Sequence, residues 1–269
     1  MLKKIVLKLL RGLGFRIERI PPSEDLLALE VMITAKNIIK KISPEFIILN
    51  GIFKGVRYPT LDITQAALTP KIVGSYEAQL HNILEKIINT PYSDIVDVGC
   101  AEGYYAVGFA YKMPKTIVHA FDINEKDLLF CRQMAELNNI RNITFSKLCS
   151  PETLVNFNFN SRGLVFCDCE GYELELFSSQ VVQTLANKNV DVLVELHEVI
   201  KPGITSELLL RFKETHDITV LSTTSPRNLG WDGLEALSQE EKDFAVFEHR
   251  GGVNKSVFME WAFLTVKCY

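Results

Sequence analysis

From residue 93 onward, short apolar runs alternate with longer stretches in which apolar residues recur at helical spacing. Such alternation is typical of βα units that build a parallel sheet. Seven apolar runs are predicted to be strands, at residues 94–98, 116–121, 143–146, 164–167, 190–195, 218–221 and 258–266. We therefore predict an α/β fold, with one doubly wound, mostly parallel seven-stranded sheet and helices on both of its faces.

The first forty residues follow a helical pattern. In residues 1–20, apolar residues recur at helical spacing between basic residues, which predicts a short amphipathic helix. Its apolar face could pack on the domain or on a second subunit of a homo-oligomer, or it could anchor the chain on an anionic lipid surface. Pro21 and Pro22 end this helix, and a second helix is predicted over residues 24–41, with Ser23 as its N-cap.

The remaining organisation is predicted from glycines and polar stretches. Within residues 45–75, Gly51 and Gly55 lie between β-prone pieces, which predicts a small hairpin before a helix that begins near Ser75. We therefore expect a helical and hairpin appendage over residues 1–90 and a main domain over residues 91–269. The polar stretch 222–257 is longer than ordinary connections within a domain and could form a substrate lid.

Four side chains of this polar stretch could contact a sugar or an anionic acceptor through charge and stacking: Arg227, Trp231, His249 and Arg250. Of these, Arg227 and Trp231 are the predicted substrate-binding residues. The alternative is surface ion pairing for the charged side chains and partial burial for the tryptophan. Both interpretations stay open at this point.

Charge and cysteine content narrow the class of protein. The 29 Lys and Arg against 33 Asp and Glu give a formal net charge of −4, so no global positive field favours nucleic acid. The six cysteines lack the density of a disulfide framework and the spacing of a zinc site, which predicts free thiols in a reducing compartment.

No run approaches the roughly 18 to 20 apolar residues of a membrane span. Lys8 interrupts the N-terminal apolar run, so we expect no signal peptide. The expected location is cytoplasmic, with peripheral contact at the inner membrane surface through residues 1–20 as an open alternative.

The first predicted strand runs directly into a turn that contains Gly99 and Gly103. Glycines let backbone amides approach a ligand closely, and the start of the helix that follows adds further N–H donors. The second strand leads to Asp122, nineteen positions after Gly103, where a carboxylate can accept hydrogen bonds from two ribose hydroxyls. The Gly-x-x-x-Gly spacing differs from the Gly-x-Gly-x-x-Gly fingerprint of dinucleotide-binding proteins, which opposes a dinucleotide-dependent oxidoreductase.

Four segments in order, VDVGCAEGYYAV, VHAFDINE, CRQMAELNNIRNI and VFCDCEGYELELF, resemble the class I S-adenosylmethionine-dependent methyltransferases, in particular the FkbM-like group. The resemblance implies a Rossmann-like methyltransferase fold and S-adenosylmethionine as the cofactor. It also implies that Asp122 holds the ribose, that the loop at residues 148–150 holds the adenine, and that the methionine part is held by Asp97, Gly99, Ala101 and Gly103. The full set of expected cofactor-binding residues is Asp97, Gly99, Ala101, Glu102, Gly103, Tyr104, Asp122, Ile123 and Cys149.

Carboxylates also follow the fourth and fifth predicted strands. Asp168, Glu170 and Glu173 lie within the six residues DCEGYE, and Glu195 and His197 share one face of a strand by two-residue alternation. We expect Glu173 only to favour the first turn of a helix. If the two strands are neighbours, Asp168, Glu195 and His197 converge beside the cofactor.

Methyl transfer to oxygen requires a group that takes the acceptor's proton. His197 is the predicted base because of the pKa range of imidazole, with Asp168 or Glu195 as orienting group or alternative base. A purely structural role for His197 stays open, and Glu170 is expected to contact the substrate. The residues Asp168, Glu195 and His197 could instead hold Mg²⁺ or another divalent ion, which would lower the pKa of the acceptor hydroxyl.

The expected fold, cofactor and base together predict a methyl transfer to oxygen. We expect the chain to methylate a hydroxyl of a sugar, a glycan or another small molecule. The motif DCEGYE stands where methylases of nucleic-acid bases carry an Asn/Asp-Pro-Pro-aromatic motif, which further disfavours a nucleic-acid substrate. A non-catalytic S-adenosylmethionine-binding or scaffold protein of the same fold is the alternative, since a fold does not establish a function.

Overall fold

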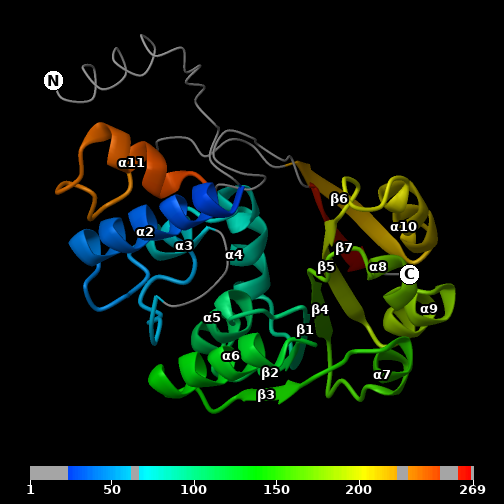
Figure 1. Ribbon diagram of the computed structural model, residues 1–269. Coiled ribbons are helices and arrows are strands. Elements are labelled where there is room, and N and C mark those ends of the chain that lie inside the picture. The colour runs from blue at the N-terminus through cyan, green and yellow to red at the C-terminus, as the bar shows by residue number, and fades with distance from the viewer. Residues whose placement is uncertain (1–23, 62–66, 223–229, 249–259, 268–269) are drawn as a thin grey trace, which may run out of the picture.

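The computed structural model describes residues 24–61, 67–222, 230–248 and 260–267 (Figure 1). Its centre is a seven-stranded sheet in the order β3-β2-β1-β4-β5-β7-β6. The strands are β1 (Asp94–Val98), β2 (Ile117–Phe121), β3 (Ile143–Ser146), β4 (Gly163–Cys167), β5 (Val190–Leu196), β6 (His216–Ser222) and β7 (Glu260–Val266).

The pairs among β1 to β5 are parallel, and β7 runs antiparallel to both of its neighbours, β5 and β6. This order, with one antiparallel strand inserted beside β5, is that of the Rossmann-like methyltransferase fold, so the predicted fold class is confirmed. Every residue of β1, β4 and β5 is buried. Central strands that are covered by helices on both faces consist of continuous apolar residues. This pattern explains why these strands could be predicted from the sequence.

Helices cover both faces of the sheet (Figure 1). One face packs against α4 (His81–Asn89), α5 (Tyr104–Lys112) and α6 (Glu125–Leu137). The other face packs against α7 (Pro151–Asn156), α8 (Glu173–Leu176), α9 (Ser179–Asn187) and α10 (Ile204–Phe212). Each face therefore has its own apolar core, and the carboxyl ends of the parallel strands lie between the two helical layers.

The helix predicted at residues 24–41 is confirmed as α2 (Glu24–Ile42). The predicted hairpin is reduced to one antiparallel bridge between Ile47 and Arg57. The predicted helix start near Ser75 is wrong. Instead α3 (Leu68–Val73) ends at Gly74, whose left-handed backbone caps it, and the 3₁₀ turn Ala78–Leu80 then leads into α4.

The segments before and after residue 90 share one core. Phe53 is fully buried, and its ring lies edge-on 5.5 Å from Phe109 of α5. The two belong to one apolar cluster with Phe166 of β4 and the fully buried Trp261 of β7. The residues before and after position 90 therefore do not have separate cores. The division into an appendage and a main domain stays a prediction.

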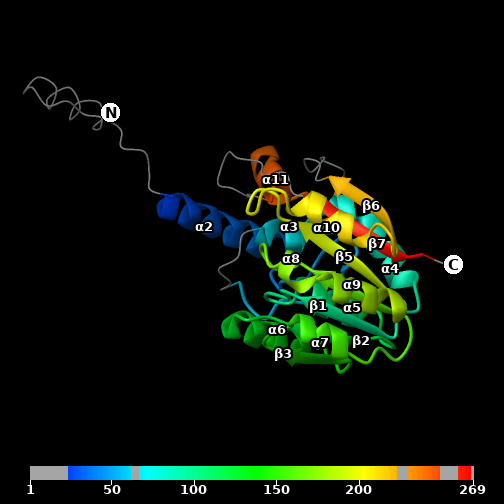
Figure 2. The ribbon, with the colours of Figure 1, turned by 90° about the vertical axis from the view of Figure 1, so that its right-hand side faces the viewer.

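Within the polar stretch 222–257, residues 230–248 contain α11 (Gln239–Val246), which packs against α2 and α3 (Figure 2). Leu234 and Leu237 join it in a small apolar cluster that includes Ile38. The remainder of the predicted lid, with Arg227, His249 and Arg250, lies outside the described residues, as does the amphipathic helix predicted within residues 1–20. None of the described helices is long and apolar enough to span a membrane.

Candidate functional site

The turn between β1 and α5 brings two strand ends into close contact. Gly99 has a φ of +83°, and a Cβ at this position would lie 1.8 Å from the backbone oxygen of Asp168, just after β4. Ala101, inside the turn, donates its backbone N–H to Asp122 Oδ2 at 2.8 Å, and Asn124 donates to Asp122 Oδ1 at 2.7 Å. The carboxylate of Asp122 thus ties the end of β2 to the glycine turn.

A cavity of about 1050 Å³ lies at the carboxyl ends of β1, β2, β4 and β5. Eight of the nine expected cofactor-binding residues line it, while Gly103 is the N-cap residue of α5. Asp168, Glu170, Glu195 and His197 line the same cavity. The structure therefore brings the glycine turn and the predicted catalytic cluster together in one space.

The carboxylate of Asp97 has no hydrogen-bond partner among the described residues. The residue has 0% exposure and lines the cavity, and neither Oδ1 nor Oδ2 accepts a bond. Burial, with the charges of Asp168, Asp122 and Glu102, raises the pKa of the Asp97 carboxyl well above its usual value. A buried carboxylate of this kind is costly unless a cation or a donor meets it, so Asp97 points to a positively charged ligand group.

His197 is held by Glu173, to which the sequence assigned only a helix-starting role. His197 Nδ1 lies 2.6 Å from Glu173 Oε1, and both side chains are buried. Burial would lower the pKa of His197, but the hydrogen bond and charge of Glu173, with the charges of Asp168 and Glu170, raise it. Burial likewise opposes the charge on Glu173, but the hydrogen bond with His197 outweighs it and lowers the pKa of Glu173. Glu173 is therefore the group that orients the imidazole.

Three carboxylates face the other ring nitrogen. His197 Nε2 lies 3.5 Å from Asp168 Oδ1, 3.5 Å from Glu170 Oε2 and 3.6 Å from Glu195 Oε2. Burial and the neighbouring Glu195 raise the pKa of Asp168 well above its usual value. The structure thus brings Asp168, Glu195 and His197 together, and it adds Glu170, whose side chain is 77% exposed.

The ligand atoms of Asp168, Glu170 and His197 lie within 4.8 Å of one another, close enough to be candidates for holding one divalent ion. The sequence predicted Glu195 as the third ligand, whereas the described geometry groups Glu170 with the other two.

Apolar side chains and thiols surround the expected adenine position. Ile123 and Leu148 are exposed and line the cavity. Cys149 also lines it, and burial raises the pKa of its thiol to about 12. The five cysteines of the described residues are free, as predicted. Trp231 does not line this cavity but contacts the ring of His81, with 6.3 Å between ring centres.

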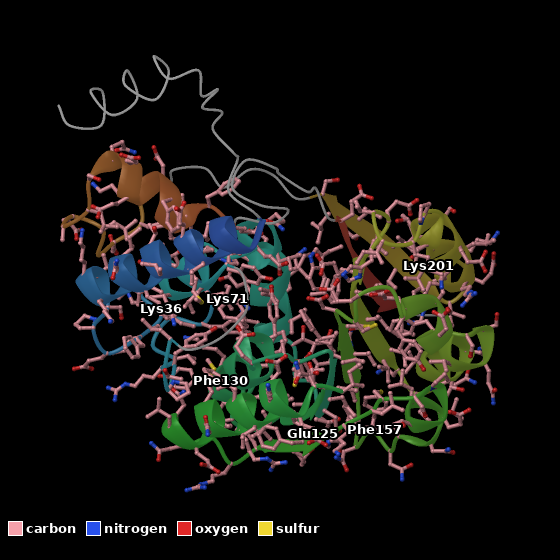
Figure 3. All side chains as sticks on the ribbon, viewed as in Figure 1. Lys36, Lys71, Glu125, Phe130, Phe157 and Lys201 are labelled. Carbon is pink, nitrogen blue, oxygen red and sulfur yellow. The ribbon has the colours of Figure 1, made fainter. Side chains whose placement is uncertain are left out.

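Lys71, on α3, was not singled out from the sequence. It is 5% exposed, lines the cavity, and places Nζ 2.6 Å from Oε1 of the buried Glu102 (Lys71 is labelled in Figure 3). Tyr58 donates its hydroxyl to the same Glu102 oxygen at 3.2 Å.

Residues 90–206 match a family model described as a methyltransferase domain. The match covers less than half of the chain, and within it lie β1 to β5, the glycine turn and the cluster around His197. The matched residues supply most of the cavity lining, while Ala67, Lys71 and Tyr76 come from residues before them.

Comparison with curated proteins gives no match. Among solved structures, a putative O-methyltransferase from Klebsiella pneumoniae is 11% identical, with 97% of this chain and 96% of that chain covered and a TM-score of 0.45. Coclaurine N-methyltransferase bound to N-methylheliamine and S-adenosylhomocysteine is 16% identical, with 98% and 93% covered and a TM-score of 0.41. The O-methyltransferase TomG from Streptomyces achromogenes is 11% identical, with 71% and 80% covered and a TM-score of 0.45.

Proposed function

We propose that the chain is an S-adenosylmethionine-dependent methyltransferase of the FkbM-like group that methylates a hydroxyl oxygen of a sugar, a glycan or another small molecule. The observation that carries the proposal is the buried, unpartnered carboxylate of Asp97, in the same cavity as the imidazole of His197. The family match to a methyltransferase domain supports the reaction class. The grouping of the DCEGYE carboxylates around His197 supports a catalytic use of that motif.

The side chains that line the cavity support the proposed cofactor by their chemistry. Asp97 would accept hydrogen bonds from the α-ammonium of the methionine part. Asp122 would accept bonds from the ribose hydroxyls, because each of its oxygens takes one backbone bond and has a second lone pair. Ile123, Leu148 and Cys149 would contact the adenine ring.

When bound, the cofactor would supply an electrophilic methyl group on a sulfonium. Transfer of this methyl group to the acceptor oxygen would release the hydroxyl proton, which needs an acceptor on the protein. The acceptor's proton goes to His197 Nε2, which faces the cavity because Nδ1 is held by Glu173. Asp168, Glu170 and Glu195 then stabilise the imidazolium through their charges.

A divalent ion at Asp168, Glu170 and His197 is a second candidate role for the cluster, favoured by the spacing of their ligand atoms. An ion there would bind the acceptor hydroxyl and lower its pKa. A titration of the protein with Mn²⁺, followed by electron paramagnetic resonance, tests this role. Loss of free Mn²⁺ signal in the unchanged protein but not in Asp168→Asn would favour the ion over His197 as the base.

Calorimetric titration of the full chain tests the proposed function directly. We expect S-adenosylmethionine and S-adenosylhomocysteine to bind with micromolar affinity, about −8 kcal/mol, and NAD not to bind. Asp97→Asn should weaken binding about tenfold or more, because the carboxylate loses its charge. Asp217→Asn, on the exposed side of β6, is the matched control and should leave binding unchanged.

Binding of NAD alone, or of none of the three ligands, would contradict the proposal. Binding of the methionine-derived ligands without methyl transfer to any sugar or small-molecule hydroxyl would favour the non-catalytic alternative.

A further inference from the structure

We propose that Lys71 binds the α-carboxylate of the cofactor's methionine part and so selects ligands that carry an intact amino-acid group. The inference rests on the proposed function and goes beyond the family match, because Lys71 lies on α3, before residue 90.

The first argument is the burial of a lysine in an acidic cavity. Among the described residues that line the cavity, seven are carboxylic acids and two are lysines. The second lysine, Lys147, is 68% exposed and pairs with Glu125. Lysines are rarely buried unless paired, and Lys71 is buried with Nζ against Glu102. Lys71 is therefore the buried lysine of this cavity that a ligand carboxylate can meet.

The second argument is a balance of charge. Asp97, Glu102 and Lys71 together carry a formal charge of −1 when ionised. The methionine part of S-adenosylmethionine carries an α-ammonium, an α-carboxylate and a sulfonium, which sum to +1. The two sums cancel in any orientation, but opposite charges meet only when the ligand ammonium lies near Asp97 and the ligand carboxylate lies near Lys71.

The third argument is the donor capacity of the lysine. An ammonium group has three N–H donors, so Lys71 can bind a ligand carboxylate while keeping its bond to Glu102. Tyr58 also bonds to Glu102, which holds the glutamate in place. The rings of Tyr76 and Tyr104, centred 4.9 Å and 5.6 Å from Nζ, stabilise the charge of Lys71 beside the cavity.

A pair of ligands that differ only in the α-carboxylate tests the proposal. The full chain is titrated with S-adenosylmethionine and with decarboxylated S-adenosylmethionine, and the ratio of the two dissociation constants is measured. We expect the unchanged protein to prefer the intact ligand by about tenfold or more, and Lys71→Met to lose this preference. Lys71→Arg should keep part of it. Lys147→Met, the other lysine of the cavity, is the matched control and should keep all of it.

Lys71→Met leaves Glu102 buried without its cation, so the fold of this variant is checked by thermal unfolding. The double variant Lys71→Met/Glu102→Gln removes both charges and serves if the single variant does not fold. An equal affinity of the unchanged protein for the two ligands would overturn the inference, and so would an equal weakening of both ligands in Lys71→Met. Binding of neither ligand by the unchanged protein would instead overturn the proposed function, and the inference with it.

Discussion

Glu173 sets the protonation behaviour of His197. Its carboxylate bonds to Nδ1, and this contact is the main reason why the pKa of the buried imidazole is raised rather than lowered. Glu173→Gln should therefore lower the pKa of His197, since the amide carries no charge. An NMR titration of the imidazole resonances measures this shift without any substrate.

The matched control for this variant is Glu175→Gln, an exposed position on the same helix whose carboxylate pairs with Lys201. It should leave the His197 titration in place. If a substrate is found, a base that must be neutral makes the rate rise with pH through the raised pKa, and Glu173→Gln should move that rise to lower pH. An unchanged His197 titration in Glu173→Gln would contradict the assigned role.

The residues predicted from the sequence and the residues missed differ in a physical respect. Gly99 and Asp122 follow from a local pattern of strand, turn and strand end, and Asp97 follows from the resemblance of that same segment to a known family. Glu173 and Lys71 act through partners 24 and 31 positions away, so only the fold reveals their contacts. In the sequence, Glu173 looked like a helix-starting residue, and Lys71 lay in the segment predicted to hold a small hairpin.

At the scale of elements, the approach of β1 to β4 depends on Gly99. Gly99→Ala would place a methyl group against the backbone oxygen of Asp168, where no flexible side chain can give way. We expect a loss of about 2–5 kcal/mol in the free energy of unfolding, from the clash together with the left-handed backbone. Urea unfolding followed by circular dichroism measures it.

Gly203 supplies the control for backbone strain alone. It has a φ of +88°, and nothing lies within 4 Å of its Cβ position. Gly203→Ala should therefore cost only about 1–2 kcal/mol. If Gly99→Ala and Gly203→Ala lowered the free energy of unfolding equally, the close contact of the turn with the end of β4 would not be the reason why position 99 requires glycine.

The sequence predicted the ends of most strands to within one or two residues, because buried parallel strands appear in a sequence as continuous apolar runs. It failed between α3 and α4. There Gly74 has a left-handed backbone, and a Cβ on it would lie 2.0 Å from the backbone oxygen of Asn50. The close approach of Gly74 to Asn50, 24 positions earlier, leaves no room for a side chain there, and no local spacing in the sequence reveals this approach.

For the whole molecule, we expect residues 24–89 to unfold together with the sheet. Phe53→Ala should lower stability by about 3–5 kcal/mol, because this fully buried ring packs against Tyr104, Tyr105 and Phe109 of α5. Unfolding followed by circular dichroism and by tryptophan fluorescence should give coincident single transitions in the variant. Leu29→Ala, at an exposed position of α2, should change stability by less than about 0.5 kcal/mol. Separate transitions for the two probes would contradict a shared core.

The place of β7 in the sheet affects how the chain is made. β6 has no paired neighbour other than β7 among the described strands, and β7 is the last of them in chain order. During synthesis on the ribosome, β5 therefore keeps one open edge, and β6 stays unpaired, until residues 260–266 have emerged. In that interval the nascent chain exposes one edge of β5 and both edges of β6, which other chains can bind. A premature stop codon before Glu260 would make this state permanent, and such a product should be a substrate for chaperones and proteases even though it contains every residue of the proposed site.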